Sequence, residues 1–239
     1  MFDLLMFDLD GTLVDTAGEI ADTVNDVLRE LRLPAVSDAQ VRGWIGQGSR
    51  ELLVRACAHA GGRAEAELRD SARLEPLLEL YTRFHQQRCG TRSQVYPQVE
   101  ATLSALRRRD MALAIVSNRE QRFAEAVLRS HGLARYFDPV VAGDTLPVRK
   151  PDPRVVEYCL RRHGVPPQRA LMVGDSAVDV AVARNAGVCC WMVPYGYKGG
   201  RPVEEAAPDR VIPDLGALLA AVQGCRDLSS MLKEQLSWQ

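Results

Sequence analysis

The sequence LLMFDLDGT at residues 4–12 joins a run of apolar residues directly to an acidic turn. The apolar run at residues 4–7 has no polar residue on either alternating face, which is typical of a strand that is buried on both sides. The Asp-Gly-Thr sequence at residues 10–12 favours a turn immediately after it. We therefore predict a buried strand that ends in a polar loop carrying Asp8 and Asp10.

Helices and strands alternate along the chain after residue 97. Alternation of this kind implies right-handed crossovers and a parallel sheet with helices on both faces, and we expect the first strand to belong to the same sheet. The strands are predicted at residues 112–116, 140–141, 171–173 and 190–193, and the helices at residues 99–109, 122–131, 154–163 and 177–186.

Residues 17–89 show helical spacing of apolar side chains and no convincing strand. Ile20, Val24 and Leu28, for example, would lie on one face of a helix. We therefore predict an all-helical insertion in an α/β core, and a further amphipathic helix in the tail at residues 224–239. The predicted boundaries are residues 17–91 for the insertion, and residues 1–16 together with 92–239 for the core.

The composition is that of an ordinary globular protein: 46% of the residues are hydrophobic, 26% are charged, and the net charge is −1. This balance argues against binding to nucleic acid, which needs clustered excess Lys and Arg. No window approaches the roughly 18 consecutive apolar residues of a membrane helix, and the N-terminus has no secretory pattern. The six cysteines show no CxxC or metal-ligand spacing. We expect reduced thiols and a cytoplasmic protein that does not contact a membrane.

Three of the predicted strands end in polar residues. Asp8 follows the first strand, Ser117-Asn118 follows the strand that begins at residue 112, and Asp175 follows the strand that begins at residue 171. Ligands of open parallel sheets bind outside the carboxyl ends of the strands, so these side chains should meet in one crevice. Each of these pieces alone is a common turn sequence, and it is their convergence that indicates a site.

The predicted crevice gathers carboxylates: Asp8, Asp10 and Asp175 would meet there, with Asp179 one helical turn beyond Asp175. Clustered carboxylates repel one another and take up protons unless a cation is present, and carboxylate oxygens without His or Cys suit Mg²⁺ best. Mg²⁺ that is held by only a few carboxylates normally binds substrate phosphate as well. The hydrogen-bond donors and positive charge that phosphate requires would come from Thr12, Ser117, Asn118 and Lys150.

Together these residues resemble the four ordered motifs of the haloacid dehalogenase superfamily of phosphohydrolases. The resemblance covers the chain to about Val222, and it implies a Rossmann-like parallel sheet core with the insertion as an all-helical cap domain. Within the superfamily, Trp44–Gly48 and Tyr195–Tyr197 are similar to the phosphoglycolate phosphatase branch. The four motifs are residues 8–12, Ser117-Asn118, Lys150-Pro151 and residues 174–179.

The resemblance implies a role for each matching residue. Asp8 would attack phosphorus and form an aspartyl-phosphate, and Asp10 would protonate the departing alkoxide and then deprotonate the attacking water. Asp8, the backbone carbonyl of Asp10 and Asp175 would hold Mg²⁺. Asp179 would orient metal-bound waters or Lys150, and Ser176 would support the same groups without binding the ion. The residues implied to hold the transferring phosphoryl group are Thr12, Ser117, Asn118 and Lys150.

The implied activity is Mg²⁺-dependent hydrolysis of small phosphomonoesters, with 2-phosphoglycolate as the favoured substrate. A closing cap excludes bulk water and fits a small phosphorylated acid better than a phosphoprotein. Gly48 and Arg50 lie where a cap would present a specificity loop; Arg50 would meet a substrate carboxylate or hydroxyl there, or would equally lie in solvent. Trp44 is expected in the cap core. We expect a monomer or a homodimer.

Other functions stay open at this point. A phosphatase for another small metabolite or a sugar phosphomutase would use the same aspartyl-phosphate, whereas a dehalogenase would leave Asp10 without a leaving group to protonate. A phospho-accepting signalling module of the receiver type has similar groups on a parallel sheet but no need for a helical insertion. Arg119, which stands where the branch often has Lys, and the four histidines receive no role. Tyr195 and Tyr197 would line the crevice or pack the loop.

Overall fold

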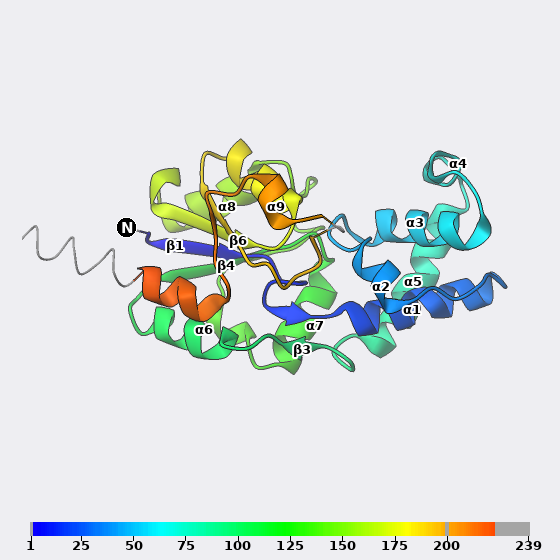
Figure 1. Cartoon of the computed structure of the whole chain (residues 1–239), viewed down its shortest axis with the longest axis horizontal. Coiled ribbons are helices and arrows are strands. Elements are labelled where there is room, and N and C mark those ends of the chain that lie inside the picture. The colour runs from blue at the N-terminus through cyan, green and yellow to red at the C-terminus, as the bar shows by residue number, and fades with distance from the viewer. Residues whose placement is uncertain (1, 199–200, 223–239) are drawn as a thin grey trace, which may run out of the picture.

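The computed structural model describes residues 2–198 and 201–222, and arranges them as a sheet with covering helices beside a group of inserted helices (Figure 1). This confirms the predicted fold class. The predicted tail helix at residues 224–239 lies outside the described residues. Within the described ranges, none of the helices combines the length and the apolar character that are needed to span a membrane.

A six-stranded parallel sheet forms the core. Its strands are β1 (Leu4–Phe7), β4 (Ala112–Val116), β5 (Val140–Val141), β6 (Ala170–Gly174), β7 (Cys189–Met192) and β8 (Arg210–Val211). The strand order is β5-β4-β1-β6-β7-β8. Every residue of β1 is buried, which explains its unbroken apolar sequence. Phe7 lies level with Ile115 on β4 and Val173 on β6, so the carboxyl ends of these three strands are side by side.

Helices cover both faces of the sheet. They are α6 (Val99–Arg107), α7 (Gln121–Ser130), α8 (Arg154–His163) and α9 (Ala177–Asn185). Alternate residues of β1 enter two separate cores: Leu5 and Phe7 pack with residues of α6 and α7, whereas Leu4 and Met6 pack with residues of α8 and α9. Figure 1 shows α8 and α9 above the sheet and α6 and α7 below it. These helices connect parallel strands of one sheet, as the alternating sequence pattern predicted.

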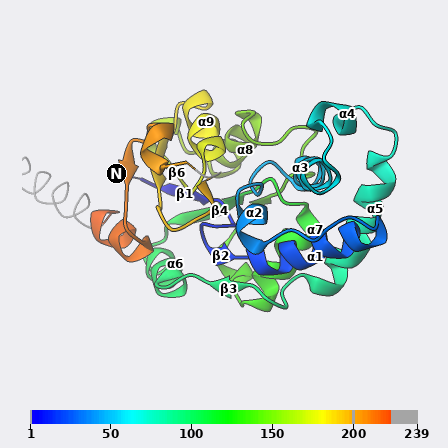
Figure 2. The ribbon, with the colours of Figure 1, turned by 45° about the vertical axis from the view of Figure 1, so that its right-hand side comes forward.

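The insertion is helical and has a core of its own. Its helices are α1 (Ala17–Glu30), α2 (Asp38–Arg42), α3 (Ser49–Gly61), α4 (Glu65–Arg69) and α5 (Leu74–Arg88). The predicted apolar face with Ile20, Val24 and Leu28 is buried in this core. Trp44 is half-buried against the same core, as expected. Figure 2 shows α1 and α5 running beside each other. The domain boundaries after residues 16 and 91 stay a prediction.

A short antiparallel ribbon joins the two connections between the core and the insertion. It pairs β2 (Val14–Asp15) with β3 (Gln94–Val95). Neither this ribbon nor β8 was predicted, because each of these two-residue strands combines one valine with one polar residue, whereas β5, which was predicted, consists of two valines. The core elements that were predicted differ from the observed ones only at their ends: the strand predicted at residues 190–193, for example, lies one residue earlier, as β7. The structure further describes three short 3₁₀-helices, Ala134–Tyr136, Pro167–Arg169 and Val203–Ala206, and a helical segment at residues 215–222 that was not predicted.

Candidate active site

The carboxyl ends of β1, β4 and β6 bring the predicted polar residues together. Asp8 follows β1, Ser117-Asn118 follows β4 and Asp175 follows β6, and all of them are buried. Lys150 lies in the segment before α8 and is also buried. Because the three strands are neighbours in the sheet, the predicted convergence on one crevice is observed.

Lys150 lies between two carboxylates. Its Nζ is 3.0 Å from Asp8 Oδ1 and 2.7 Å from Asp179 Oδ1. The other oxygen of Asp179 accepts hydrogen bonds from the Ser176 hydroxyl, at 2.7 Å, and from the backbone N–H of Asp175, at 3.2 Å. Ser176 and Asp179 form a capping box at the start of α9. The helix start therefore fixes Asp179, and Asp179 fixes the ammonium beside Asp8.

Asp175 is enclosed by the polypeptide. Its Oδ1 accepts a hydrogen bond from the Thr12 hydroxyl at 3.1 Å, and its Oδ2 accepts one from the backbone N–H of Tyr197 at 2.6 Å. A Cβ atom at Gly196 would lie 2.2 Å from Asp175 Oδ2, and one at Gly11, where φ is +85°, would lie 2.4 Å from it. Only glycine allows the backbone this close. In this structure the Thr12 hydroxyl donates to Asp175, and the binding of phosphate by Thr12 stays a prediction.

Burial perturbs the acidic groups of the site. Burial raises the pKa of Asp8 to about 7; Lys150 lowers this pKa, and the charges of Asp179 and Asp10 raise it. The pKa of Asp175 is raised well above its ordinary value, by burial first and then by the charges of Asp179 and Asp8. Carboxylates in so dry a place favour protonation unless a cation neutralises them.

The donor atoms suit a hard divalent cation. Carboxylate oxygens of Asp8, Asp175 and Asp179 lie within 4.8 Å of one another, and all three residues are buried. Oxygen donors without His or Cys fit Mg²⁺. Both oxygens of Asp179 already bind Lys150 and Ser176, which fits a supporting role for Asp179 and leaves Asp8 and Asp175 as the carboxylates for the ion.

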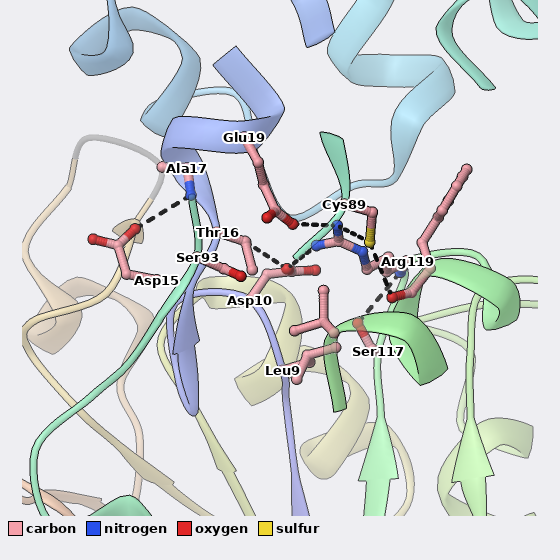
Figure 3. A network of polar contacts seen from close by, with 12 residues as sticks. Leu9, Asp10, Asp15, Thr16, Ala17, Glu19, Cys89, Ser93, Ser117 and Arg119 are labelled. Carbon is pink, nitrogen blue, oxygen red and sulfur yellow. Dashed lines mark hydrogen bonds and ion pairs between the residues drawn. The ribbon is translucent and has the colours of Figure 1, made fainter. Parts of the chain in front are cut away.

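Asp10 is held from two sides. Its Oδ1 accepts a hydrogen bond from the Thr16 hydroxyl at 2.6 Å and forms an ion pair with Nη1 of Arg119 at 2.5 Å (Figure 3). Asp10 lies with Asp8 at the edge of a cavity of about 40 Å³ between core and insertion. Such a volume holds a few water molecules or a small group.

Both parts of the molecule line this cavity. The core contributes Asp8, Asp10 and residues 117–120, while the insertion contributes mainly apolar side chains such as Ile20 and Leu52. Polar groups on the core side and apolar groups on the insertion side match a small ligand whose polar end reacts. The remaining insertion residues that line the cavity are Ile45, Gly46, Gly48, Ser49, Tyr81 and His85.

The loop before α3 contacts the core directly. The Asn118 side chain donates hydrogen bonds to the backbone carbonyls of Gly46, at 3.0 Å, and Lys150, at 3.1 Å. Gly48 has a φ of +88°, and a Cβ atom there would lie 2.9 Å from the Arg149 guanidinium, so this position requires glycine. Arg50 forms an ion pair with Glu75 and lines a neighbouring hollow beside Lys150. The predicted roles of Gly48 and Arg50 in specificity stay predictions.

Three buried polar residues at the site were given no role from the sequence: Arg119, Glu19 and His85. Arg119 follows Ser117-Asn118 directly, and its position beside a motif was the available signal. Glu19, which is 0% exposed, lies on the buried side of α1. A carboxylate on such a face was also a signal, because charged groups are rarely buried without a partner.

The tyrosines after β7 pack the loop against the site. The Tyr197 hydroxyl accepts a hydrogen bond from the Thr16 backbone N–H at 2.7 Å, and the Tyr195 hydroxyl donates one to the Thr12 carbonyl at 2.8 Å. Neither side chain is among the residues that line the cavity. Of the two alternatives that the sequence left open, the structure favours packing.

A parallel sheet that presents buried carboxylates beneath an inserted helical cap defines a class of hydrolases. The family model described as haloacid dehalogenase-like hydrolase matches residues 5–193 of the chain. The chain belongs to this family. The predicted membership and the predicted class of enzyme, a phosphatase of this superfamily, are therefore confirmed.

Relatives within the family resemble the chain along most of its length. The phosphoglycolate phosphatase of Vibrio cholerae is 39% identical over 222 residues, which are 92% of this chain and 96% of that protein. Phosphoglycolate phosphatase 1 of Pseudomonas aeruginosa is 41% identical over 221 residues, which are 90% and 78% of the two chains. A crystal structure of a predicted phosphoglycolate phosphatase from Haemophilus somnus has a TM-score of 0.86 at 31% identity, covering 92% of this chain and 98% of that one.

Proposed function

We propose that the protein is a Mg²⁺-dependent phosphatase of small phosphomonoesters that acts through an aspartyl-phosphate on Asp8, with 2-phosphoglycolate as its main substrate. The observation that carries the proposal is the position of Asp8. It lies at the end of the central strand, 3.0 Å from the Lys150 ammonium, on the edge of a cavity that the insertion covers. A carboxylate in this place is well positioned for attack on a phosphoryl group bound above it.

The first half of the reaction transfers the phosphoryl group to Asp8. A carboxylate oxygen of Asp8 forms a bond to phosphorus, and the bond between phosphorus and the ester oxygen breaks. The electron pair of the broken bond leaves with that oxygen, and a proton from the carboxyl group of Asp10 neutralises it. The alcohol, glycolate in the favoured case, then departs.

The second half of the reaction releases phosphate. Asp10, now ionised, takes a proton from a water molecule, and the oxygen of that water forms a bond to phosphorus. The bond between phosphorus and Asp8 breaks, and its electron pair returns to the Asp8 carboxylate. Asp10 is then protonated again, so one water molecule is consumed and both carboxyl groups return to their starting states.

The other predicted residues would bind rather than react. Lys150, Ser117, Asn118 and Thr12 would hold the phosphoryl oxygens, and Asp8, the carbonyl of Asp10 and Asp175 would hold Mg²⁺, with Asp179 and Ser176 orienting them. Lys150 suits this task because its ammonium already faces Asp8. When bound, Mg²⁺ would supply positive charge that offsets the charge of the transferring group.

Two observations support a small acidic substrate. The cavity beside Asp8 and Asp10 is lined by the insertion as well as by the core, and a covered site favours a small ester over a phosphoprotein. The two curated relatives described above are named phosphoglycolate phosphatases. Gly48 ends the loop whose Gly46 carbonyl binds Asn118, and Arg50 lies in the first turn of α3, beside the hollow that Lys150 also lines. We propose that this segment of the insertion selects the substrate.

The setting follows from the same proposal. We place the enzyme in the cytoplasm, as a monomer or a homodimer. The thiols of the described cysteines are free, which suits a reducing compartment.

The test is phosphate release from a panel of phosphorylated metabolites, with and without Mg²⁺. We expect Mg²⁺-dependent release that is fastest from 2-phosphoglycolate, and a loss of at least about a thousandfold in Asp8→Asn. Asp138→Asn is the matched control, because Asp138 pairs with Arg162 before β5, at the opposite end of the sheet. Full activity in Asp8→Asn would overturn the nucleophile, and preference for another ester would overturn the substrate. Turnover that requires a sugar bisphosphate primer would indicate a phosphomutase.

A further inference from the structure

We propose that Arg119 is a positioning residue for Asp10, and that the insertion holds Arg119 in place through Glu19 and His85. The inference rests on the proposed function, in which Asp10 gives and takes the proton. It extends that function, because it makes the acid step depend on buried contacts from α1 and α5. Arg119 touches neither phosphorus nor the leaving oxygen in this account.

Arg119 bridges the core and the insertion with the two ends of its guanidinium group. Nη1 is 2.5 Å from Asp10 Oδ1, and Nη2 is 3.0 Å from Glu19 Oε1 and 2.6 Å from His85 Nε2. The side chain is buried, so these contacts are little weakened by water. The guanidinium of Arg119 binds Asp10 and Glu19 through two separate nitrogens, whereas a lysine would have to reach both carboxylates from a single nitrogen.

Glu19 connects this cluster to both chain segments that enter the insertion. Glu19 lies in the first turn of α1, directly after the chain passes from the core into the insertion. One carboxylate oxygen, Oε1, binds Arg119, and the other accepts a hydrogen bond from the backbone N–H of Gly90 at 2.7 Å, in the second connection. Figure 3 shows Glu19 reaching toward Arg119 from the helix above. The position of Arg119 therefore depends on how the insertion sits on the core.

His85 is a neutral hydrogen-bond acceptor for Arg119. The Thr23 hydroxyl donates its only proton to the Glu19 carbonyl at 2.7 Å, so it must accept the hydrogen bond that joins it to His85 Nδ1 at 2.9 Å. Nδ1 therefore carries the ring proton, and Nε2 presents its lone pair to Arg119. The rings of Tyr81 and Phe123 pack on the imidazole, with centroids 5.2 and 4.5 Å away. The ring is fixed in orientation as well as in tautomer.

A metal ion is excluded as the natural occupant of this cluster. Glu19, His85 and Cys89 present ligand atoms within 4.8 Å of one another. The same three groups surround Nη2 of Arg119, which is 3.6 Å from Cys89 Sγ. The guanidinium already occupies the place that a cation would take, and it supplies the positive charge.

The contacts leave Asp10 able to exchange a proton. The bonds from Thr16 and Arg119 both end on Oδ1, and none of the hydrogen bonds among the described residues ends on Oδ2. A carboxylic acid that carries its proton on Oδ2 can still accept both bonds on Oδ1. Arg119 and Thr16 therefore orient the carboxyl group, and Oδ2 is the oxygen that would meet the leaving group and later the water.

Two substrates with different leaving groups can distinguish a positioning role of Arg119 from general structural support of the site. The alkoxide of 2-phosphoglycolate must be protonated as it leaves, whereas the nitrophenolate of p-nitrophenyl phosphate is stable without a proton. A variant that only misplaces Asp10 slows transfer from the first ester much more than transfer from the second. A variant that loosens the whole site slows both to the same extent.

The experiment measures the first half of the reaction, formation of alcohol in a single rapid-quench turnover, with both esters and Mg²⁺. The variants are Arg119→Lys, Glu19→Gln and His85→Gln, and Asp10→Asn is the reference. Arg92→Gln is the control, since Arg92 pairs with Asp22 across the same junction but not with Asp10. We expect Asp10→Asn to slow the alkyl ester about a hundredfold or more. For Arg119→Lys we expect alcohol formation to slow about tenfold or more with the alkyl ester and less than about threefold with the aryl ester. Glu19→Gln and His85→Gln should show the same preference with smaller changes in rate. Arg92→Gln should change neither rate.

Equal slowing of both esters, or rates like those of Arg92→Gln, would overturn the inference. If Arg119→Lys does not fold, the ratio of the two rates in Glu19→Gln and His85→Gln decides. The proposed function fails separately, when Asp10→Asn slows both esters equally or the wild type transfers no phosphoryl group. The inference alone fails when Asp10→Asn discriminates between the esters and the Arg119, Glu19 and His85 variants do not.

Discussion

Lys150 is the only lysine among the residues at the candidate site, and its ammonium offsets two carboxylates that would otherwise face each other in a dry place. Asp8 and Asp179 each lie within hydrogen-bond distance of it. Removing one partner of a buried ion pair leaves the other charge without compensation, and that loss costs more than the pair itself contributes. The residue is therefore expected to matter for folding as well as for catalysis.

We predict that Lys150→Met lowers the free energy of unfolding by about 3 kcal/mol at neutral pH without Mg²⁺. Asp8 and Asp179 then lose the ammonium that lies 3.0 and 2.7 Å away. Urea unfolding followed by circular dichroism measures the change. Lys150→Arg keeps the positive charge but changes the shape of the cationic group, so it shows how much of the effect comes from charge alone. An unfolding free energy equal to that of the wild type would contradict the prediction.

His85 gives stability a pH dependence of known sign. Burial, followed by the charges of Arg119 and Arg122, lowers the pKa of His85 to about 2 in the folded protein. The unfolded chain takes up a proton at the ordinary value of about 6.5, so the folded state is penalised as the pH falls below that value. This stabilising contribution is complete above the unfolded pKa and is lost progressively on acidification.

We predict that His85→Gln lacks the loss of unfolding free energy that protonation of His85 in the unfolded chain causes on acidification. Between about pH 7 and about pH 5, the wild type should lose about 2 kcal/mol more of its unfolding free energy than the variant does. The comparison between the two proteins cancels the titration of the acidic residues. Denaturant unfolding at several pH values measures it, and parallel curves would show that His85 is charged or exposed in the folded state.

At the scale of elements, the loop after β7 closes over Asp175. A Cβ atom at Gly196 would lie 2.2 Å from Asp175 Oδ2, so the loop or the carboxylate must move in Gly196→Ala. We predict that Gly196→Ala needs about a tenfold higher Mg²⁺ concentration for half-maximal activity, because displacing the groups that orient a metal ligand lowers the affinity for the metal by about this factor. Titration of phosphate release with Mg²⁺ measures the change.

The control for this loop is Gly43→Ala. A Cβ atom at Gly43 would have its nearest neighbour at 3.4 Å, an ordinary contact, and the residue has a φ of −68°. Its Mg²⁺ dependence should match that of the wild type. An unchanged Mg²⁺ dependence in Gly196→Ala as well would remove Asp175 from the metal site.

The elements also show what the sequence could predict. The strand β1 was predicted from its unbroken apolar run, and the helix α1 from the helical period of its apolar residues. The strands β2, β3 and β8 have neither signal, because each consists of one valine and one polar residue. Asp8 and Asp175 were predicted because each directly follows a strand, and Asp10 and Asp179 because they lie two and four residues beyond them. The cluster of Arg119 with Glu19 and His85 was not, because it joins residues 100 and 34 positions apart through tertiary packing alone.

At the scale of the whole molecule, the cation and protons compete for the same carboxylates. Burial raises the pKa of Asp8 to about 7 and that of Asp175 well above its ordinary value. A raised carboxyl pKa favours the folded protein while the group holds its proton. Without Mg²⁺, this contribution is therefore lost as the pH rises from the unfolded pKa of about 4 toward the folded one.

We predict that Mg²⁺ raises the unfolding midpoint more at about pH 8 than at about pH 5.5, because protons occupy the carboxylates at the lower pH. Thermal unfolding with and without a fixed Mg²⁺ concentration measures the two shifts. Asp175→Asn should lose most of the shift at both pH values. Equal shifts in the wild type at the two pH values would place the ion away from these carboxylates.

The covalent intermediate tests the link between fold and reaction directly, because Asp8, the residue that follows the central strand β1, would carry the phosphoryl group. Enzyme mixed with 2-phosphoglycolate and Mg²⁺ is quenched rapidly in acid, and the peptide that contains residues 8–10 is analysed by mass spectrometry. We predict a transient phosphoryl group on Asp8 that appears before free phosphate and is absent in Asp8→Asn. Steady release of phosphate with no phosphoryl group on Asp8 at any time would contradict the account.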